Sequence, residues 1–160
     1  MKKTLMILLA TLFATLAFSQ QKPNTPNNST MKQPTTQQIK AVYNIPALIG
    51  KKIDEVKKMI IAGGASANGI EEPTKAQLNL LDWDWSFKKD GYELQITFYP
   101  KTRVVKEFFL ATNDPSGRTS DYKKLLKIGN LVETDLKYKV EPFHPLDNKS
   151  VYTGILITKK

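Results

Sequence analysis

Residues 83–99, WDWSFKKDGYELQITFY, decide the fold of this chain. Apolar and polar side chains alternate on both sides of Asp90-Gly91, the dipeptide most typical of a two-residue type I′ hairpin turn. This turn brings three pairs of large apolar side chains to one face of the hairpin: Trp83 with Phe98, Trp85 with Ile96, and Phe87 with Leu94. A slip of one residue would turn all six toward solvent, so we expect a firm register.

The two tryptophans allow two interpretations. Exposed rings would form a platform on which a carbohydrate or a peptide stacks. Alternation of Trp83 and Trp85 with the polar Asp84 and Ser86 favours a position in the core instead. Exposure would also uncover the apolar residues of the facing strand, a patch that is unusual on a monomer. We therefore expect both rings to pack in the core.

A helix is predicted before the hairpin, from about Lys52 to a stop at Gly63-Gly64. Its apolar residues recur at helical spacing, and acidic side chains come early in it, as the helix dipole favours. The inward residues are Ile53, Val56 and Ile60, with Met59 as a possible addition.

Residues 45–63, IPALIGKKIDEVKKMIIAG, also carry a family pattern. The string Ile-Pro-x-Leu-Ile-Gly-Lys-x-Ile-x-Glu-Val-Lys-Lys, closing on Ala-Gly, resembles the opening of a PASTA repeat, the small extracellular module of cell-wall kinases and penicillin-binding proteins. The resemblance implies binding to peptidoglycan. It ends there, because no Gly-x-Val strand or closing Pro-Gly segment follows at the spacing of the repeat.

Residues 65–81, ASANGIEEPTKAQLNLL, have no clear period. Gly69, Pro73 and the polar content predict a surface loop, with one helical turn between Pro73 and Leu80. A loop of this length in a compact domain is commonly functional or mobile. We therefore expect a variable binding element here, between Asn68 and Leu80.

A third strand is predicted over residues 103–111, RVVKEFFLA, but two registers are open. The first points Val104, Phe108 and Leu110 inward together with Lys106, and the second points Val105 and Phe109 inward together with Glu107. A β-bulge near Lys106-Glu107 would reconcile the two sets.

The remaining elements follow from similar patterns. A second helix should begin at an N-cap, Ser120 or Asp121, and end at Gly129-Asn130. A fourth strand is predicted where Leu136, Tyr138 and Val140 alternate with charged residues, followed by a loop over 142–148 and a fifth strand over 151–158. Gly154 marks either a bulge or a close approach of the backbone. A short first strand is possible over residues 42–45.

These elements do not alternate as βαβ units, so the sequence predicts an α+β fold. We expect an antiparallel sheet of four to six strands with two helices packed on one face. This arrangement is similar to that of β-lactamase-inhibitor-like exported folds.

The N-terminus predicts export. Lys2-Lys3 precede an apolar run over residues 5–18, and Ala17-Phe18-Ser19 supplies small residues at a cleavage site before Gln20. Residues 1–19 are therefore interpreted as a signal peptide, with no membrane span left after cleavage. Residues 20–40, rich in Pro, Asn, Thr and Gln, are predicted to be a disordered linker before a single domain over 41–160. The predicted location is the periplasm or the medium.

Composition excludes several classes of site. The chain of 160 residues has no cysteine and one histidine, which excludes disulfides, thiolate zinc sites and multi-histidine metal sites. Of the net charge of +9, +2 lies in the predicted signal peptide, +3 in the predicted linker and +4 in the domain. The lysines of the domain are scattered among acidic residues rather than gathered in a stripe with aromatic residues, so nucleic acid is not expected as a partner. We expect no cofactor and no metal, and a partner that is a protein or a component of the cell envelope.

No catalytic set stands out in the sequence. His144 lies between prolines, and the paired carboxylates Glu71-Glu72 and Asp82/Asp84 are the remaining candidates, which leaves a small secreted hydrolase as an alternative. Two weaker signals are Lys123 and Lys127, which would form an anion site or a solvated face, and the glycosylation acceptor pattern at 148–150. The sequence thus favours a non-catalytic binding module, with a hydrolase or a peptidoglycan-binding module as alternatives.

Overall fold

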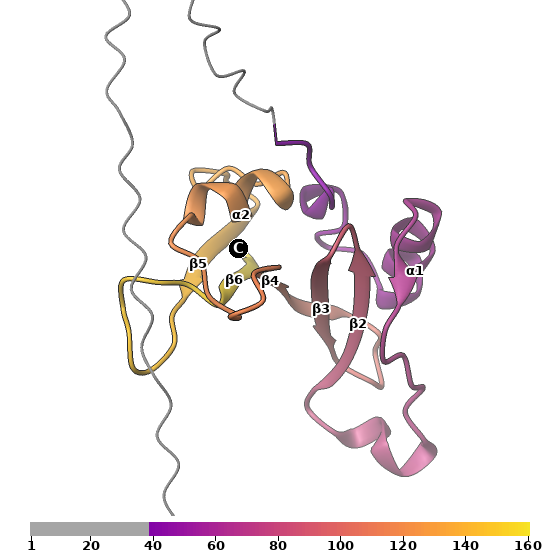
Figure 1. The fold of residues 1–160 in the computed structure, drawn as a ribbon. Helices are drawn as coiled ribbons and strands as arrows, with labels where there is room; N and C mark the ends of the chain where they lie inside the picture. Colours follow the sequence, from indigo (N-terminus) through magenta and orange to yellow (C-terminus); the bar gives the residue numbers. More distant parts are fainter. Residues whose placement is uncertain (1–38) are drawn as a thin grey trace, which may run out of the picture. The chain divides into compact units, whose positions relative to one another are not determined.

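The computed structural model describes residues 39–160 (Figure 1). The predicted signal peptide and residues 20–38 of the predicted linker lie outside the described residues. Ile39, near the end of the predicted linker, is partly buried against the core. None of the helices in the described range is long and apolar enough to cross a membrane.

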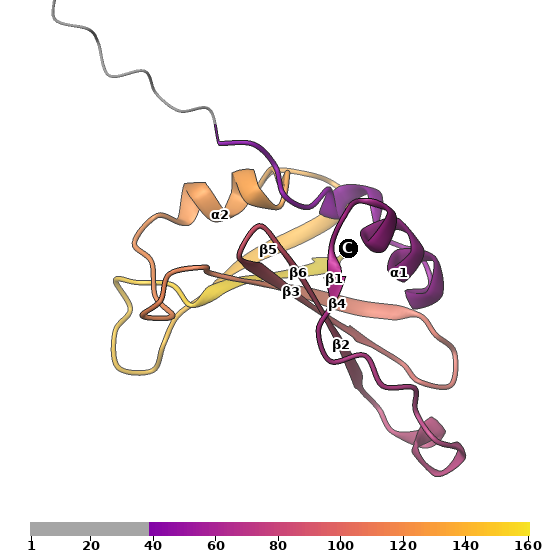
Figure 2. The ribbon, with the colours of Figure 1, turned by 45° about the vertical axis from the view of Figure 1, so that its right-hand side comes forward.

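One antiparallel sheet of six strands forms the centre of the domain, with the strand order β1-β2-β3-β4-β6-β5. Two α-helices, α1 and α2, lie on one face of this sheet (Figure 2). The α+β class, the antiparallel sheet and the two helices are therefore confirmed. The strands are β1 (Ser66–Ala67), β2 (Trp83–Lys89), β3 (Tyr92–Phe98), β4 (Val105–Ala111), β5 (Tyr138–Phe143) and β6 (Gly154–Lys159), and the helices are α1 (Ile53–Ala62), α2 (Tyr122–Ile128) and the 3₁₀ turns η1 (Ile45–Ala47) and η2 (Lys75–Asn79).

The β2–β3 hairpin has the predicted register, with Trp83 opposite Phe98 and Phe87 opposite Leu94. Asp90 and Gly91 both have positive φ, 49° and 80°, as a type I′ turn requires. Of the six apolar side chains on the inner face, all are fully buried except Trp83, which is partly exposed. The core interpretation of the tryptophans is thus confirmed for Trp85, and Trp83 lies at the edge of the core.

A β-bulge settles the register of β4. Thr97 opposes Glu107 and the next residue, Phe98, opposes Val105, which leaves Lys106 as the extra residue. The inward set therefore changes parity at the bulge: Val105 is partly buried before it, and Phe108 and Leu110 are buried after it. The predicted bulge is confirmed, and neither uninterrupted register is present.

Both helices begin and end where the sequence predicts. Helix α1 starts at Ile53 and is followed by Gly63. Helix α2 starts after Asp121, whose carboxylate accepts a hydrogen bond from the Lys124 backbone N–H at 2.8 Å. It ends at Gly129, and Asn130 follows with a φ of 55°.

Several predicted strand limits are wrong. Residues 42–45 form no strand, because the backbone N–H groups of Val42 and Tyr43 both bond to the Ile128 carbonyl and the chain then turns into η1. Strand β5 begins only at Tyr138, and Leu136 is 87% exposed. It also continues through 142–143, where a loop was expected; Pro142 is tolerated because β5 is an edge strand.

Gly154 opens β6, three residues later than the predicted strand, and it marks a close approach. A Cβ at Gly154 would lie 2.6 Å from the Leu110 carbonyl oxygen and 2.6 Å from the Phe109 ring. The two-residue strand β1, within the predicted loop, is an element that no pattern in the sequence indicated.

Candidate binding surface

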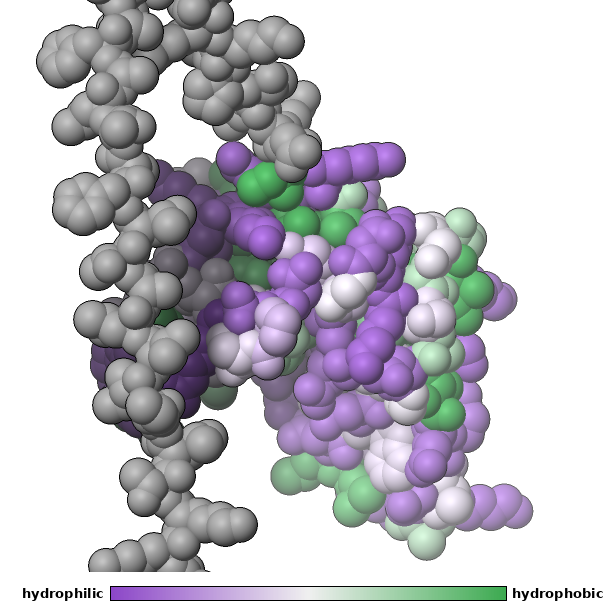
Figure 3. Space-filling model, viewed as in Figure 1, coloured by the Kyte–Doolittle hydropathy of each residue, from purple (hydrophilic) through white to green (hydrophobic). Residues whose placement is uncertain are grey.

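An exposed cluster of apolar side chains lies where the loop before β2 meets the β3–β4 turn. We call it the leucine groove and define it by Leu78, Leu80, Leu81, Tyr99, Lys101 and Val104. Its volume is about 480 Å³. Four of its apolar side chains are largely open to solvent: Leu81 is 78% exposed, Leu80 50%, Val104 44% and Tyr99 41%. Apolar side chains gather at this end of the molecule in Figure 3, where Figure 1 places the loop that carries η2.

The base of this loop is fixed by the two tryptophans. The indole N–H groups of Trp83 and Trp85 both donate to the backbone carbonyl of Glu71, at 2.8 and 2.7 Å. Closer to α1, the backbone N–H of Asn68 donates to the Ser86 carbonyl at 2.8 Å. Strand β2 therefore holds the loop through the indole N–H groups of its two tryptophans.

Arg103 also holds this loop in place. Its guanidinium donates to both carboxylate oxygens of Asp54 in α1, and to the Glu72 carboxylate of the loop at 2.9 Å. The guanidinium carbon also lies 4.9 Å from the centre of the Trp85 ring. One side chain thus joins α1, the loop and the sheet.

The charges of this cluster stabilise one another. Hydrogen bonding to Arg103 lowers the pKa of Asp54, and the bond to Asp54 is the main reason why the pKa of Arg103 is raised. The backbone completes the joint, because the Ile53 N–H at the start of α1 donates to the Arg103 carbonyl at 2.9 Å. Arg103 itself has a φ of 62°, which is unusual for a residue with a side chain.

The tip of the loop is also ordered locally. Thr74 and Gln77 form a capping box at the start of η2, in which the Thr74 N–H and hydroxyl both donate to the Gln77 side-chain oxygen, at 2.9 and 2.8 Å. The Leu80 N–H then closes η2 on the Gln77 carbonyl at 3.0 Å, and Leu80 itself is extended. The leucines after η2 are therefore presented to solvent by a braced segment.

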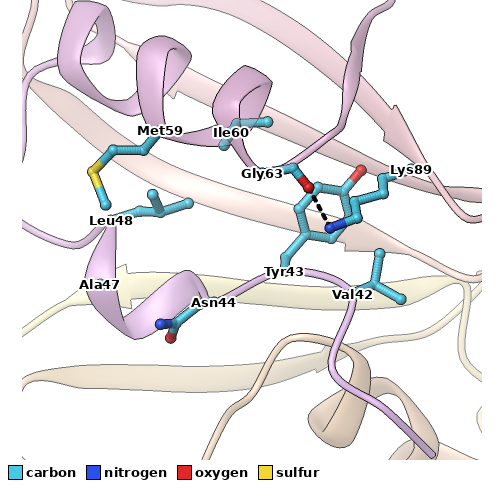
Figure 4. Close-up of a pocket in the computed structure, with 9 residues that line it drawn as sticks. All are labelled: Val42, Tyr43, Asn44, Ala47, Leu48, Met59, Ile60, Gly63 and Lys89. Carbon is cyan, nitrogen blue, oxygen red and sulfur yellow. Dashed lines mark hydrogen bonds between the residues drawn. The ribbon is translucent and has the colours of Figure 1, made fainter.

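A more enclosed cavity lies between η1 and α1 (Figure 4), and its volume is about 200 Å³. Pockets that hold cofactors or drug-sized ligands usually measure about 300–1,000 Å³. Its polar groups are already engaged: Lys89 donates to the Gly63 carbonyl at 2.5 Å, and the Tyr43 hydroxyl lies 3.1 Å from the carbonyls of Phe87 and Tyr92. Burial raises the pKa of Tyr43. The cavity therefore offers little to a ligand.

The catalytic candidates from the sequence contact different groups, and Asp84 accepts a hydrogen bond from the Thr97 hydroxyl at 2.6 Å. Glu72 pairs with Arg103, while Asp82 pairs with Lys106 at 2.7 Å. Glu71 contributes its backbone carbonyl to the tryptophans. His144 is bonded through Nδ1 to the Val151 carbonyl at 2.8 Å, in the loop between β5 and β6.

The weaker signals lie on exposed surfaces. Lys123 and Lys127 are exposed on α2, and residues 148–150 are exposed in the β5–β6 loop. Within residues 39–160, no group of three or more histidine or acidic side chains is placed to hold a metal ion.

The structure adds residues that sequence reasoning did not single out. Arg103 was interpreted only as the start of a strand, although it is one of just two arginines among the 24 basic residues, which was the available signal. Tyr99 completes the leucine groove from the β3–β4 turn, together with Val104, which one of the two predicted registers pointed inward and which is 44% exposed. The loop itself was the predicted place for a binding element.

Comparisons with known proteins identify no relative: no family model, no curated protein and no solved structure matches the chain.

Proposed function

We propose that this chain is an exported, non-catalytic binding module that holds an apolar segment of a partner protein in the leucine groove. The observation that carries the proposal is the exposure of Leu80, Leu81, Tyr99 and Val104 around one concavity. Contiguous exposed apolar surface of this kind marks interaction sites in soluble proteins.

The fixed base of the loop supports this function. A binding loop that is ordered before it meets its partner loses less conformational entropy on binding. The loop is held by the two indole bonds to Glu71, by the Glu72–Arg103 pair and by the capping box at Thr74. Those contacts leave the leucine side chains free for a partner.

The composition of the groove favours a protein partner. Protein interfaces combine an apolar, aromatic-containing centre with a polar rim. Leu80, Leu81 and Tyr99 supply the centre here, and Lys101 is the polar residue of the groove. Full burial of one leucine side chain contributes about 1.5–3 kcal/mol, so Leu81 is the expected anchor.

A peptide selection tests the proposal even though the partner is unidentified. Peptides from a random displayed library are selected on the wild-type protein and then measured against the double variant L80S/L81S. The matched control is L136S/L146S, because Leu136 and Leu146 are 87% and 102% exposed outside the groove. We expect apolar peptides whose affinity falls at least tenfold in the groove variant and stays unchanged in the control.

Two results would contradict the proposal. One is a selection in which no peptide distinguishes L80S/L81S from the control. The other is a selection that yields no peptide for the wild-type protein, although this protein co-sediments strongly with lipid vesicles or with peptidoglycan. Co-sedimentation would indicate that the leucines or the PASTA-like segment bind the cell envelope instead.

Export has its own test. The full chain is expressed in a Gram-negative host, and the protein recovered from the periplasm or medium is sequenced from its N-terminus. We expect Gln20 as the first residue. Recovery of intact Met1 from the cytoplasm alone would refute the export assignment.

A further inference from the structure

The face of the sheet opposite the helices is open. Both α1 and α2 lie on the inner face, and within residues 39–160 no helix covers the other side (Figure 2). The strand pairings place two continuous rows of side chains across this outer face. The first row is Asp84, Thr97, Glu107, Thr158 and Lys139, and the second is Ser86, Gln95, Phe109, Leu156 and Glu141.

The centre of the outer face is apolar. Phe109 and Leu156 are directly opposite each other on β4 and β6, and both are partly exposed. The ring of Phe143, on the edge strand β5, meets the Phe109 ring edge to face with 5.5 Å between centroids. Phe143 is 52% exposed. A small aromatic cluster thus lies open on an otherwise polar sheet.

Three lysines on or beside these rows are paired with carboxylates. Lys88 pairs with Glu93 at 3.7 Å, and Lys139 pairs with Glu141 at 2.7 Å. Lys106, the extra residue of the bulge, has its ammonium on Asp82. The positive charges of these three lysines therefore have little left to offer a ligand.

Two carboxylates on the same face have no such partner. No cation pairs with Asp84 or Glu107 within 4.0 Å in the part of the chain that the structure describes. Both belong to one row, with Thr97 between them, and the Thr97 hydroxyl donates to Asp84 at 2.6 Å. Two strand spacings separate the two residues, which corresponds to about 10 Å. These two carboxylates therefore lie outside any ion pair of the described residues, beside the aromatic cluster.

We propose that the open sheet face binds a basic amphipathic segment of a partner protein. Lysine or arginine side chains of the segment pair with Asp84 and Glu107, while its apolar side chains cover Phe109, Leu156 and Phe143. Complementary charge of this kind sets the register and the orientation of a bound segment.

The size and charge of the face favour a segment over a second copy of this chain. A third, partial row contains Lys88, Glu93, Ala111, Gly154 and Phe143. Five strands by these three rows measure about 24 Å by 20 Å, or about 500 Å², whereas a stable complex buries about 800 Å² per partner. Two copies of the face would also bring the carboxylates of Asp84 and Glu107 against one another. A single helix of about 14 residues is about 21 Å long and fits the face.

A synthetic peptide of lysine and leucine, about 14 residues long and patterned as an amphipathic helix, is the probe. Its affinity for the mature protein is measured by fluorescence anisotropy at low ionic strength. We expect D84N/E107Q to bind it at least fivefold more weakly than the wild type, and F143A at least threefold more weakly. The control E55Q/D90N removes the same number of charges outside the outer face, and its affinity should change less than twofold.

The leucine groove is tested in parallel, because this inference does not rest on it. L80S/L81S should keep the wild-type affinity for the lysine–leucine peptide. Equal weakening by D84N/E107Q and E55Q/D90N would overturn the inference, since it would show attraction to net charge alone. The inference would also be overturned if L80S/L81S alone weakened binding of the lysine–leucine peptide. It would be overturned as well if the wild type formed a dimer that F143A abolished. Unchanged circular dichroism must accompany each variant.

Discussion

Replacing Arg103 with alanine should destabilise the domain by about 2 kcal/mol. The partly exposed ion pairs with Asp54 and Glu72 contribute about 1 kcal/mol, after screening by solvent. The stacking of the guanidinium on Trp85 contributes about another 1 kcal/mol. Neither carboxylate is left buried, because both side chains are more than half exposed, so no large desolvation penalty is added.

Arg103→Gly should be less damaging than Arg103→Ala, although glycine removes the same contacts. The φ of 62° at Arg103 costs about 1–2 kcal/mol for a residue with a Cβ. Glycine avoids that cost but loses about 0.7 kcal/mol more conformational entropy on folding. The balance favours R103G over R103A by about 0.3–1.3 kcal/mol.

Urea unfolding followed by tryptophan fluorescence measures this difference, because both tryptophans lie at the Arg103 cluster. The control pair is K101G and K101A. Lys101 is not among the residues with positive φ, so glycine should be no better than alanine there. An R103G variant that is less stable than R103A would refute the claim that the positive φ at position 103 is costly for a residue with a Cβ.

Three further changes have expected outcomes. Gly154→Ala should cost about 1–3 kcal/mol in urea unfolding, because its Cβ would lie 2.6 Å from the Leu110 carbonyl, and no loss would show that β4 and β6 approach less closely. Asp121→Ala should cost about 1 kcal/mol by removing the cap of α2, measured as a fall in melting temperature that Asp121→Asn largely avoids. Asp54 has a folded-state pKa below its ordinary value of 3.8, so its contribution is present above about pH 4 and is lost as pH falls through the lowered pKa. D54N should therefore be less stable than the wild type at neutral pH, and the gap should close on acid titration; a constant gap down to pH 2 would contradict the pairing with Arg103.

Elements with strong local patterns could be predicted from the sequence. The hairpin at Asp90-Gly91 has its register because alternation and turn geometry act within seventeen consecutive residues. The bulge at Lys106 could be placed because two apolar sets of opposite parity meet there. The end of α1 at Gly63 and the cap of α2 at Asp121 are likewise local signals.

The errors arise where distant residues decide the outcome. Residues 42–45 look like a strand, yet their N–H groups bond to the end of α2 rather than to the sheet. Leu136 alternates correctly but lies beyond the end of β6, so it has no strand to pair with. The leucine groove was predicted only in part, because the loop meets the β3–β4 turn where Arg103 pairs with Glu72, which lies 31 positions away in the chain.

The central claim is that the leucine groove is a binding site that is ready before its partner arrives. Its most direct test is an NMR titration of the mature protein, labelled with ¹⁵N, with one of the selected apolar peptides. We predict that the backbone signals of residues 78–81 and 99–104 shift, while those around the small cavity at Tyr43 and Met59 do not. Shifts confined to that cavity or to the outer sheet face would contradict the claim.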